Sequence, residues 1–441
     1  MSSESVPPSS PGRGRRSLLR ALTGGGALAA LALTPSGPAA ADTAPAGAAG
    51  SGPDAATGAD PFASDAFRAG GRVREFWLQA DSFEHNAVPN GRDAMTGATF
   101  TAAQTTFQAV GYRAYTPQWG KPLPGDLSPE GIGPNTGIPG PVLRAEVGDV
   151  IRVHFRNNDS HYRWPHSLHP HGVRYTPDND GAWMADLPDK DGTAVPYGGT
   201  YTYTWTCVPG SVGSWPYHDH AAPQIPLKPS DPAPATTPPA ADSAPAAPSP
   251  SVSPSVSASS VSPSATEGGQ GQGGGSMDMG DNVETADAVR AFGGGGGPVM
   301  EIGAELGLFG MIAVTDARTP KVDREFVLFF HDVSAADAPP LGQDLSLCNG
   351  GAFVDNAPTF TARSGDRVRW RVATLGNSFH TFHIHGHRWR TAAGWTDTEM
   401  LGPATTLTVE YREDNPGDWL YHCHVAAHMM HGMAGRYRVT S

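Results

Sequence analysis

The chain has 441 residues, of which 38% are hydrophobic, 55 are glycine and 42 are proline, and its formal net charge is −13. This length suits two or three ordinary domains, but the glycine and proline content indicates that part of the chain is not packed core. The acidic balance argues against a nucleic-acid partner. No apolar run approaches the roughly 20 residues that would cross a bilayer, so we expect no membrane span.

Residues 1–41 have the features of an export signal. Arg15 and Arg16 precede a short apolar run, and alanines at 39–41 offer a small-residue cleavage site. This order is similar to that of twin-arginine signal peptides, which predicts an exported protein located outside the cell or in the cell envelope. The alternative is a basic disordered tail. Residues 42–70, rich in Ala, Gly and Pro, are predicted to form a disordered N-terminal segment.

From Val73 onward, short β-rich runs alternate with Gly and Pro, and no amphipathic helix of useful length is evident. This pattern is typical of antiparallel β-sandwiches and predicts an all-β fold. Three cysteines are too few for a disulfide framework. Cys207 and Cys348 either form one bridge in an oxidising compartment or remain free.

Four sequence blocks occur twice in the same order, which is the signature of a duplicated domain. The matched blocks are 141–155 with 358–372, 166–175 with 380–389, 214–220 with 418–424, and 307–314 with 432–439. They predict two copies of one β-domain, the first formed by residues 71–225 plus 298–318 and the second by residues 319–441.

The first copy is much longer than the second between its last two blocks. Residues 226–297 are rich in Pro, Ala, Ser and Gly. Such a composition buries too little apolar surface to offset the entropy lost on ordering. We therefore predict a long disordered insertion within the first domain.

Four His-x-His pairs recur in the matched blocks. Residues two apart on a strand point to the same face, about 6–7 Å apart, so each pair presents two imidazoles to one side. The pairs are His169/His171, His218/His220, His383/His385 and His422/His424. Eight imidazoles in matched pairs predict a polynuclear metal site.

The second copy adds the donor set of a blue-copper electron-transfer site, which is two imidazoles, a thiolate and a weak thioether. These donors are His380, Cys423, His428 and Met433. Zinc would account for the histidines but not for the methionine. Strand alternation places Cys423 on one face and its two neighbouring histidines on the other, so one stretch of chain links the blue site to the cluster.

The first copy has lost most of this donor set. Asp219 stands where the second copy has Cys423, and His166 is the counterpart of His380. Counting forward from the histidine pair places Gln224 at the position of the second imidazole and Pro229 at that of the thioether. The first domain is therefore predicted to hold cluster ligands only.

Together, the motifs HPHG, HDH, HTFHIHGH and HCHVAAHMMHGM resemble those of the multicopper oxidases, and within them the bacterial two-domain (small) laccases. The resemblance covers residues 73–225 and 304–441. It implies two cupredoxin-like Greek-key β-sandwich domains. It also implies copper as the cofactor, with four ions per functional unit: one type 1, one type 2 and two type 3.

The resemblance also implies a ligand set, position by position. The type 1 copper would take His380, Cys423 and His428, with Met433 axial. The type 2 copper would take His169 and His383, and the two type 3 coppers would take His171, His218 and His424, and His220, His385 and His422.

The reaction implied is laccase-like: phenols or aromatic amines lose single electrons at the type 1 copper, and dioxygen is reduced to water at the trinuclear cluster. Oxidation of Cu(I), Fe(II) or Mn(II) is the alternative. Cys423 and the flanking His422 and His424 would carry the electrons. Asp180 resembles an acid that relays protons in relatives, or else is a plain turn residue before Gly181.

Two-domain relatives form rings of three subunits, so the resemblance implies a homotrimer with its trinuclear sites between chains. Dioxygen and a small reducing substrate would be the only other partners. A copper nitrite reductase would carry its blue copper in the first domain, the reverse of this chain. A non-catalytic copper-binding protein would not need Cys423 between two cluster ligands.

Overall fold

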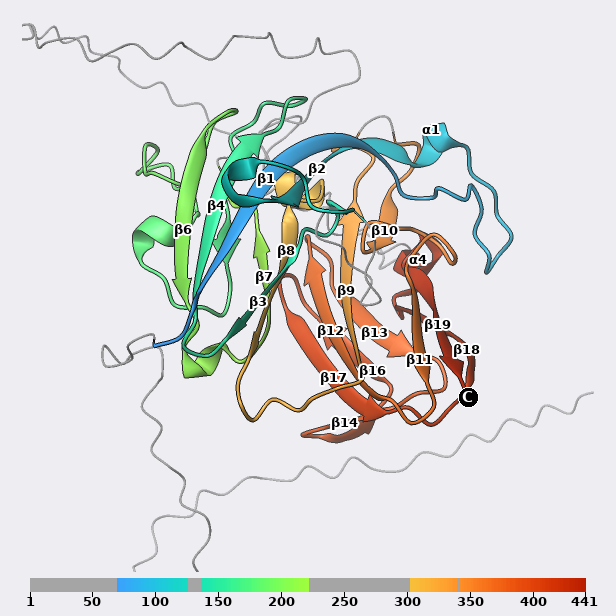
Figure 1. Cartoon of the computed structure of the whole chain (residues 1–441). Helices are drawn as coiled ribbons and strands as arrows, with labels where there is room; N and C mark the ends of the chain where they lie inside the picture. The colour runs from blue at the N-terminus through green and yellow to red at the C-terminus, as the bar shows by residue number, and fades with distance from the viewer. Residues whose placement is uncertain (1–69, 126–135, 222–301, 339–340) are drawn as a thin grey trace, which may run out of the picture. The chain divides into compact units, whose positions relative to one another are not determined.

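The computed structural model describes residues 70–125, 136–221, 302–338 and 341–441, and the regular secondary structure of these residues is mostly β-strand (Figure 1). The predicted export signal and the insertion at 226–297 lie outside the described residues, as does the 42–70 segment apart from its last residue. Among the described residues, no helix is long and apolar enough to span a membrane.

Two four-stranded sheets form the first half, in the orders β2-β1-β4-β6 and β3-β8-β7-β5. Their strands are β1 (Val73–Asn86), β2 (Thr106–Tyr115), β3 (Val142–Glu146), β4 (Val150–Asn158), β5 (His169–Pro170), β6 (Thr200–Thr206), β7 (Gly213–His218) and β8 (Phe309–Thr315). In β4, buried and half-buried positions alternate, as the sequence pattern predicts for a strand at the edge of a core. β8 pairs with both β3 and β7, so the chain beyond residues 222–301 completes the same sandwich.

The second half repeats this plan, with sheets in the orders β10-β9-β12-β17 and β11-β19-β18-β13-β16 and the small hairpin β14-β15. Its strands are β9 (Arg324–Val333), β10 (Leu345–Cys348), β11 (Thr359–Arg363), β12 (Arg367–Leu375), β13 (His380–Ile384), β14 (Trp389–Thr391), β15 (Gly394–Thr396), β16 (Thr398–Leu401), β17 (Thr406–Arg412), β18 (Gly417–Cys423) and β19 (Ala434–Thr440). The prediction of an all-β fold with two sandwiches is confirmed.

Helices in the described part of the chain are single turns. They are α1 (Ala102–Thr105), α3 (Ile302–Glu305) and α4 (Ala426–Met430), with 3-10 turns at Pro117–Trp119, Pro177–Asn179 and Pro209–Ser211. Two of them matter for the site, because α3 and α4 each lead into the last strand of a sandwich, β8 and β19.

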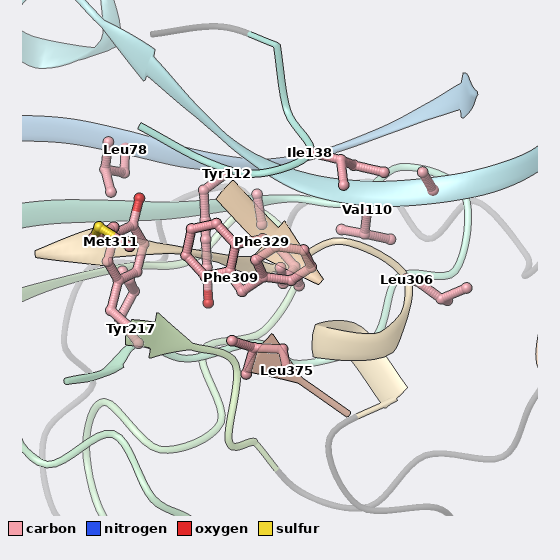
Figure 2. Close-up of a cluster of buried hydrophobic side chains, with 14 of the residues drawn as sticks. Leu78, Val110, Tyr112, Ile138, Tyr217, Leu306, Phe309, Met311, Phe329 and Leu375 are labelled. Atoms are coloured by element: carbon pink, nitrogen blue, oxygen red, sulfur yellow. The ribbon is translucent and has the colours of Figure 1, made fainter. Parts of the chain in front are cut away.

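A continuous apolar core joins the two sandwiches (Figure 2). Phe309 of β8 and Phe329 of β9 are fully buried, and their ring centroids lie 5.0 Å apart. Tyr112 and Tyr217 pack in the same cluster, and so does Leu375 of β12. Each fully buried apolar side chain of this size contributes about 1.5–3 kcal/mol, so the two halves stabilise each other.

An ion cluster also joins the two sandwiches. Arg144 of β3 and Arg369 and Arg371 of β12 surround Glu325 of β9, and Arg371 also donates a 2.8 Å hydrogen bond to Ser214 of β7. Burial opposes ionisation of Glu325, but the three guanidinium groups lower its pKa to about 2. This carboxylate therefore stays charged and paired at neutral pH.

The cysteines do not form a bridge. Cys207, just after β6, and Cys348, in β10, are both buried and free. Cys207 belongs to the apolar cluster that joins the two sandwiches, and Cys348 belongs to a separate cluster within the second sandwich. Of the two outcomes that the sequence left open, the structure has the free thiols.

Candidate metal centres

Strand pairing sets the histidines of each sandwich opposite one another in the same way. In the first sandwich β5 pairs with β7, and His169 lies opposite His218. In the second, β13 pairs with β18, and His383 lies opposite His422. The two His-x-His motifs of each sandwich therefore meet on adjacent strands, although some 40 to 50 residues separate them in the chain.

The first imidazole set consists of His169, His171, His218 and His220. The Nε2 atoms of His171 and His218 lie 3.2 Å apart, and the ring centroid of His169 lies within 5.1–5.4 Å of the other three rings. His218 is buried and the other three side chains are half-buried. Three of these histidines, all but His220, place a ring nitrogen within 4.8 Å of one another, close enough to share a metal ion.

The second imidazole set consists of His383, His385, His422 and His424, and its geometry matches the first. The Nε2 atoms of His385 and His422 lie 3.1 Å apart, and three of the four again form a group within 4.8 Å. The ring of His383 contacts the other three. His385 and His424 are exposed, so this set opens to solvent in the single chain.

Backbone carbonyls hold four of these rings through Nδ1. The four bonds are His169 to Asp180 O (2.7 Å), His218 to Asp219 O (3.0 Å), His383 to Asp397 O (2.8 Å) and His422 to Cys423 O (2.9 Å). An imidazole that donates its Nδ1–H to a carbonyl keeps the lone pair on Nε2 for a metal. The equivalent rings of the two sandwiches therefore present the same atom.

Burial keeps three of the imidazoles in the two sets neutral. Desolvation first, and neighbouring imidazoles after it, lower the pKa of His171 to about 4 and that of His218 to about 3. In the second set the same two causes lower the pKa of His422 to about 4. A neutral imidazole is the form that ligates a metal.

A third group lies in the core of the second sandwich. The Nδ1 atoms of His380 and His428 lie 3.8 and 3.6 Å from Cys423 Sγ. His380 and Cys423 are fully buried, whereas His428, on α4, is half-buried. Met433 is fully buried in the same apolar cluster as Cys423. All four residues predicted for the blue site therefore belong to one neighbourhood.

A carboxylate that sequence analysis missed lies behind this group. Asp332 Oδ2 is 3.4 Å from Nε2 of His380, on the side of the ring opposite Cys423, and Ser346 donates a 2.6 Å hydrogen bond to Asp332 Oδ1. Burial raises the pKa of Cys423, so the thiol keeps its proton until a metal displaces it. No motif indicated Asp332, because strand β9 brings it from some 50 residues away.

Asp180 lies against the first imidazole set, where it contacts His169. Its Oδ1 is 3.4 Å from His169 Nδ1, and its Oδ2 is 3.8 Å from Lys190 Nζ, a neighbour that the sequence did not indicate. The Asp180 side chain is 25% exposed, so it touches both a half-buried imidazole and water. The ring centroid of Tyr175, whose pKa burial and Asp180 raise, lies 6.1 Å from that of His169.

Two family models, each described as multicopper oxidase, match residues 118–226 and 330–441, which together make half of the chain. The matched ranges contain both imidazole sets and the cysteine group. The chain belongs to the multicopper oxidase family. The donors fit copper: an S/N group of two imidazoles, a thiol and a buried thioether is the soft set that copper favours, and neutral imidazoles suit copper as well.

An animal ferroxidase and animal hephaestins are among the similar curated proteins. The ferroxidase HEPHL1 of Homo sapiens is 26% identical over 419 residues, covering 84% of this chain and 29% of the relative. Human hephaestin is 27% identical over 84% of this chain and 30% of its own length. The chain thus spans less than a third of the length of these relatives.

Among solved structures, a copper nitrite reductase from Nitrosomonas europaea matches with a TM-score of 0.50 and 15% sequence identity, covering 84% of this chain and 94% of that one. At this identity the likeness concerns the fold alone. The predicted pair of cupredoxin-like sandwiches is confirmed.

The first sandwich of this multicopper oxidase keeps the backbone of a blue-copper loop without its ligands. In the second sandwich, Met433 N–H donates to His428 O at 2.9 Å where α4 leads into β19. In the first, Leu308 N–H donates to Gly303 O at 2.8 Å where α3 leads into β8. The matching bonds identify Gly303 as the structural counterpart of His428 and Leu308 as that of Met433.

Gln224 and Pro229 are therefore not the counterparts of His428 and Met433. Counting forward from the histidine pair had predicted these two residues, which lie outside the described residues. The count fails because the extra length of the first copy precedes the ligand loop, so the true counterparts are found by counting backward from β8. Glycine and leucine offer no metal donor at either position.

A charged group fills the first sandwich where the second has its cysteine group. Asp219 Oδ2 lies 2.8 Å from Nδ1 of His166, and Asp159 Oδ2 lies 3.1 Å from its Nε2. All three side chains are at least nine-tenths buried. Burial alone would lower the pKa of His166, but the carboxylates of Asp219 and Asp159 raise it to about 9. We call these residues the Asp159–His166–Asp219 clamp.

The raised pKa of His166 makes the stability of the metal-free chain depend on pH. The imidazolium stabilises the fold fully below the ordinary pKa of 6.5, and this stability is lost as pH rises through about 9. The loss is about 3 kcal/mol in the free energy of unfolding. Urea unfolding of metal-free protein at pH 6.5 and 9.5 measures it. His166→Gln should be less stable at pH 6.5 and lose less on going to pH 9.5, and parallel losses in the two proteins would contradict the assignment.

The other histidines lie outside the three groups. His387 contacts Glu413 at 3.0 Å, and His85 contacts the carbonyl of Gly350 at 2.7 Å. His331 is buried against Phe309, and burial lowers its pKa to about 3. His154 stacks on Trp77 and His161 is exposed.

Proposed function

We propose that the protein is a copper-dependent oxidase that takes single electrons from a small reducing substrate and passes them to dioxygen, which becomes water. The observation that carries this proposal is the position of Cys423. Its side chain lies in the cysteine group, while its two neighbours, His422 and His424, belong to the second imidazole set. One tripeptide of β18 thus joins two metal-binding groups by covalent bonds.

The proposed ligands follow from the three groups. His380, Cys423, His428 and Met433 would hold a type 1 copper. The Nε2 atoms of His171 and His218, and those of His385 and His422, lie about 3 Å apart, which supports assigning each pair to one type 3 copper. His424 would complete the first of these ligand sets and His220 the second, and His169 with His383 would hold the type 2 copper. When bound, copper supplies one-electron oxidation at the first site and dioxygen reduction at the cluster.

Asp180 is proposed to deliver protons to the cluster. Its carboxylate contacts His169 on one side and is partly exposed on the other, so it exchanges protons with water while lying next to a cluster ligand. Lys190 Nζ lies 3.8 Å from the same carboxylate.

The export route through a twin-arginine signal and the division into domains at 71–225 plus 298–318 and 319–441 are part of the same proposal.

We further propose a homotrimer in which each cluster forms between chains. Ring contacts of the described residues join imidazoles within each set and do not join the two sets. The second set is open, with His385 and His424 exposed. Head-to-tail contact between the first set of one chain and the second set of the next closes into a ring, which ends the assembly.

Phenols or aromatic amines are the proposed substrates. The cysteine group reaches the surface only through His428 on α4, because His380 and Cys423 are fully buried. On the same helix Met430 is 56% exposed, which gives a small organic molecule an apolar surface beside the half-buried imidazole.

Oxidation of a metal ion, Fe(II) above all, is the second candidate, and two observations favour it. The side chain of Asp332 lies beside His380 and is 27% exposed, although its Oδ2 atom is buried, so it places a partly exposed acidic group next to the proposed electron-accepting site. The curated relatives include ferroxidases.

Oxygen uptake by the copper-loaded protein tests the two candidates, with a phenol compared against Fe(II), Mn(II) and Cu(I). If a metal ion is the substrate, Asp332→Asn should lower kcat/KM for that ion by about 10-fold more than it lowers kcat/KM for the phenol, because the phenol does not use the carboxylate as a ligand. Asp344→Asn, which removes an exposed carboxylate just before β10, is the matched control. No oxygen uptake with any of the four reductants would contradict the oxidase proposal itself.

A further inference from the structure

The clamp in the first sandwich repeats, bond for bond, the contacts of the cysteine group in the second. Ser167 N–H donates to Asp219 Oδ1 at 2.8 Å, as Thr381 N–H donates to Cys423 Sγ at 3.3 Å. Asp219 N–H donates to the carbonyl of Leu308 at 3.0 Å, as Cys423 N–H donates to the equivalent carbonyl of the second sandwich at 3.1 Å. The carboxylate therefore occupies the place of the sulfur.

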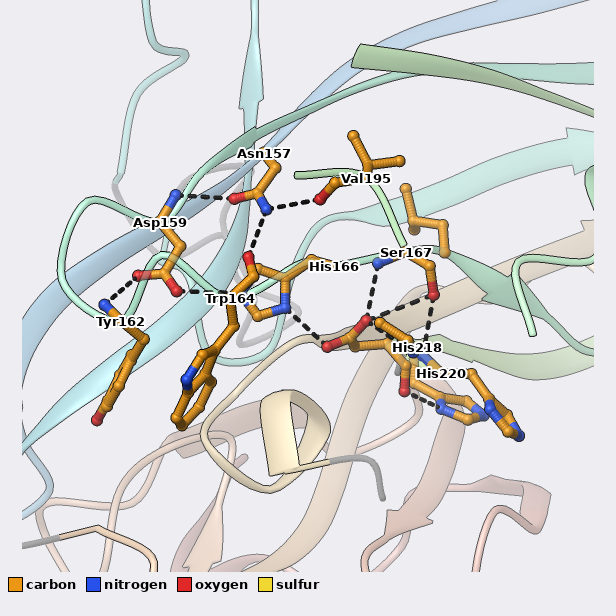
Figure 3. A network of polar contacts seen from close by, with 12 residues as sticks. Asn157, Asp159, Tyr162, Trp164, His166, Ser167, Val195, His218 and His220 are labelled. Carbon is orange, nitrogen blue, oxygen red and sulfur yellow. Dashed lines mark hydrogen bonds and ion pairs between the residues drawn. The ribbon is translucent and has the colours of Figure 1, made fainter. Parts of the chain in front are cut away.

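The same contacts reach the two histidines. The Ser167 hydroxyl accepts a 3.1 Å hydrogen bond from the backbone N–H of His220, and it lies 3.4 Å from Asp219 Oδ1. His218 donates its Nδ1–H to the carbonyl of Asp219 itself. Figure 3 shows this network running from Asp159 through His166 and Ser167 to His218 and His220. Every step along it is a direct hydrogen bond or ion pair.

The surroundings of Asp219 are built for a carboxylate and leave no room for a ligand. A Cβ on Gly303 would lie 2.1 Å from Asp219 Oδ2, so the residue opposite the carboxylate is one without a side chain. The far end of the network is also anchored, because Asp159 Oδ1 accepts the backbone N–H of Tyr162 at 3.0 Å. The clamp is thus closed at both ends and fully satisfied, as a buried ionic group must be.

We propose that the Asp159–His166–Asp219 clamp holds His218 and His220 in their ligand positions before any copper binds, so the first-sandwich half of the cluster is formed without metal. This inference rests on the proposed function, because it takes those two histidines as copper ligands. The three clamp residues are positioning residues and touch no reacting atom.

The second sandwich has the same backbone contacts, but its side-chain contacts are longer. Cys423 Sγ lies 3.8 and 3.6 Å from the imidazole nitrogens of His380 and His428, and Asp332 Oδ2 lies 3.4 Å from Nε2 of His380. The two bonds of the clamp to His166 are 2.8 and 3.1 Å long. We therefore expect the first imidazole set of the metal-free protein to be held more firmly than the second.

Hydrogen exchange of the metal-free full chain tests the clamp directly. In the unsubstituted protein, backbone amides at 217–221 should exchange at least about 10-fold more slowly than those at 422–428, and adding copper should slow mainly the latter. Asp219→Asn keeps the shape of the side chain but removes the charge that holds His166. It should raise exchange at 217–221 and weaken copper binding at the cluster by about 10- to 100-fold, as loss of a supporting hydrogen bond does at metal sites.

Two further variants keep the test decisive. Asp149→Asn is the control, because it removes another buried carboxylate of the same sandwich, one paired with Arg74 at 2.7 Å, and should not change exchange at 217–221. Ser167→Ala leaves the ion pairs of the clamp intact and removes the hydroxyl that accepts the backbone N–H of His220. It should raise hydrogen exchange at 217–221 less than Asp219→Asn does. It replaces Asp219→Asn as the test if that variant does not fold.

The outcomes separate this inference from the proposed function. Unchanged exchange at 217–221 in both Asp219→Asn and Ser167→Ala would overturn the clamp, and so would a rise no larger than in Asp149→Asn. Normal copper affinity alongside faster exchange would also overturn it. If the unsubstituted protein binds no copper at the histidines, measured by metal content and electron paramagnetic resonance, the proposed function fails, whatever the exchange rates are.

Discussion

Replacing Cys423 by serine is expected to abolish the thiolate-to-copper absorption and to reduce oxidation of every substrate to background. Cys423 provides the sulfur of the group formed with His380 and His428, and its backbone joins that group to His422 and His424. A serine hydroxyl at this position is a poor copper ligand and removes the site, yet both imidazole sets keep their own supports. Copper at the cluster should therefore remain.

Three measurements check this expectation: visible absorption, total copper and oxygen uptake. Cys348→Ser is the matched control, because it alters a buried thiol of the same apolar cluster that is not part of the metal group. Burying its hydroxyl destabilises the fold by on the order of 1–3 kcal/mol, but absorption and activity should persist in the folded protein. Substrate oxidation by the Cys423→Ser variant would disprove the proposed electron path.

The sequence predicts the metal groups well because their signal is local. A His-x-His pair places two imidazoles on one face of any strand, and the two copies of the repeat predict which pairs meet. The observed pairing of His169 with His218 and of His383 with His422 follows from this. The all-β fold is predictable for the same reason, since alternation and turn residues are properties of short segments.

The supports of the metal groups are not predictable in this way. Asp332 and Asp159 reach their histidines through tertiary folding, and nothing in their own neighbourhoods distinguishes them from other acidic residues. The sequence repeat placed Asp219 at the position of Cys423, but it did not predict the ion pair of Asp219 with His166, which depends on how β7 packs against a loop. The counterpart of His428 was misplaced because an insertion changes sequence spacing without moving the backbone that follows it.

Co-expression of two inactive variants is expected to restore oxidase activity. One chain lacks His169 and His171 and cannot complete the first imidazole set, and the other lacks His383 and His385 and cannot complete the second. Each variant alone should be inactive. In a ring of three, the intact first set of one variant can face the intact second set of the other, so co-expressed chains should regain a sizeable part of the activity of the unsubstituted protein.

The composition of the mixed assembly shows whether the restored activity comes from clusters shared between chains. Differently tagged chains, purified through both tags in succession, should carry copper at the cluster and the restored activity together, at the mass of a trimer. A mixture of the same two proteins purified separately and kept at low concentration, where rings do not exchange subunits, serves as the control and should stay inactive. If each cluster formed within a single chain, His169 and His383 would have to come from the same polypeptide. Neither variant could then supply what the other lacks, and inactive mixed trimers would exclude a cluster shared between chains.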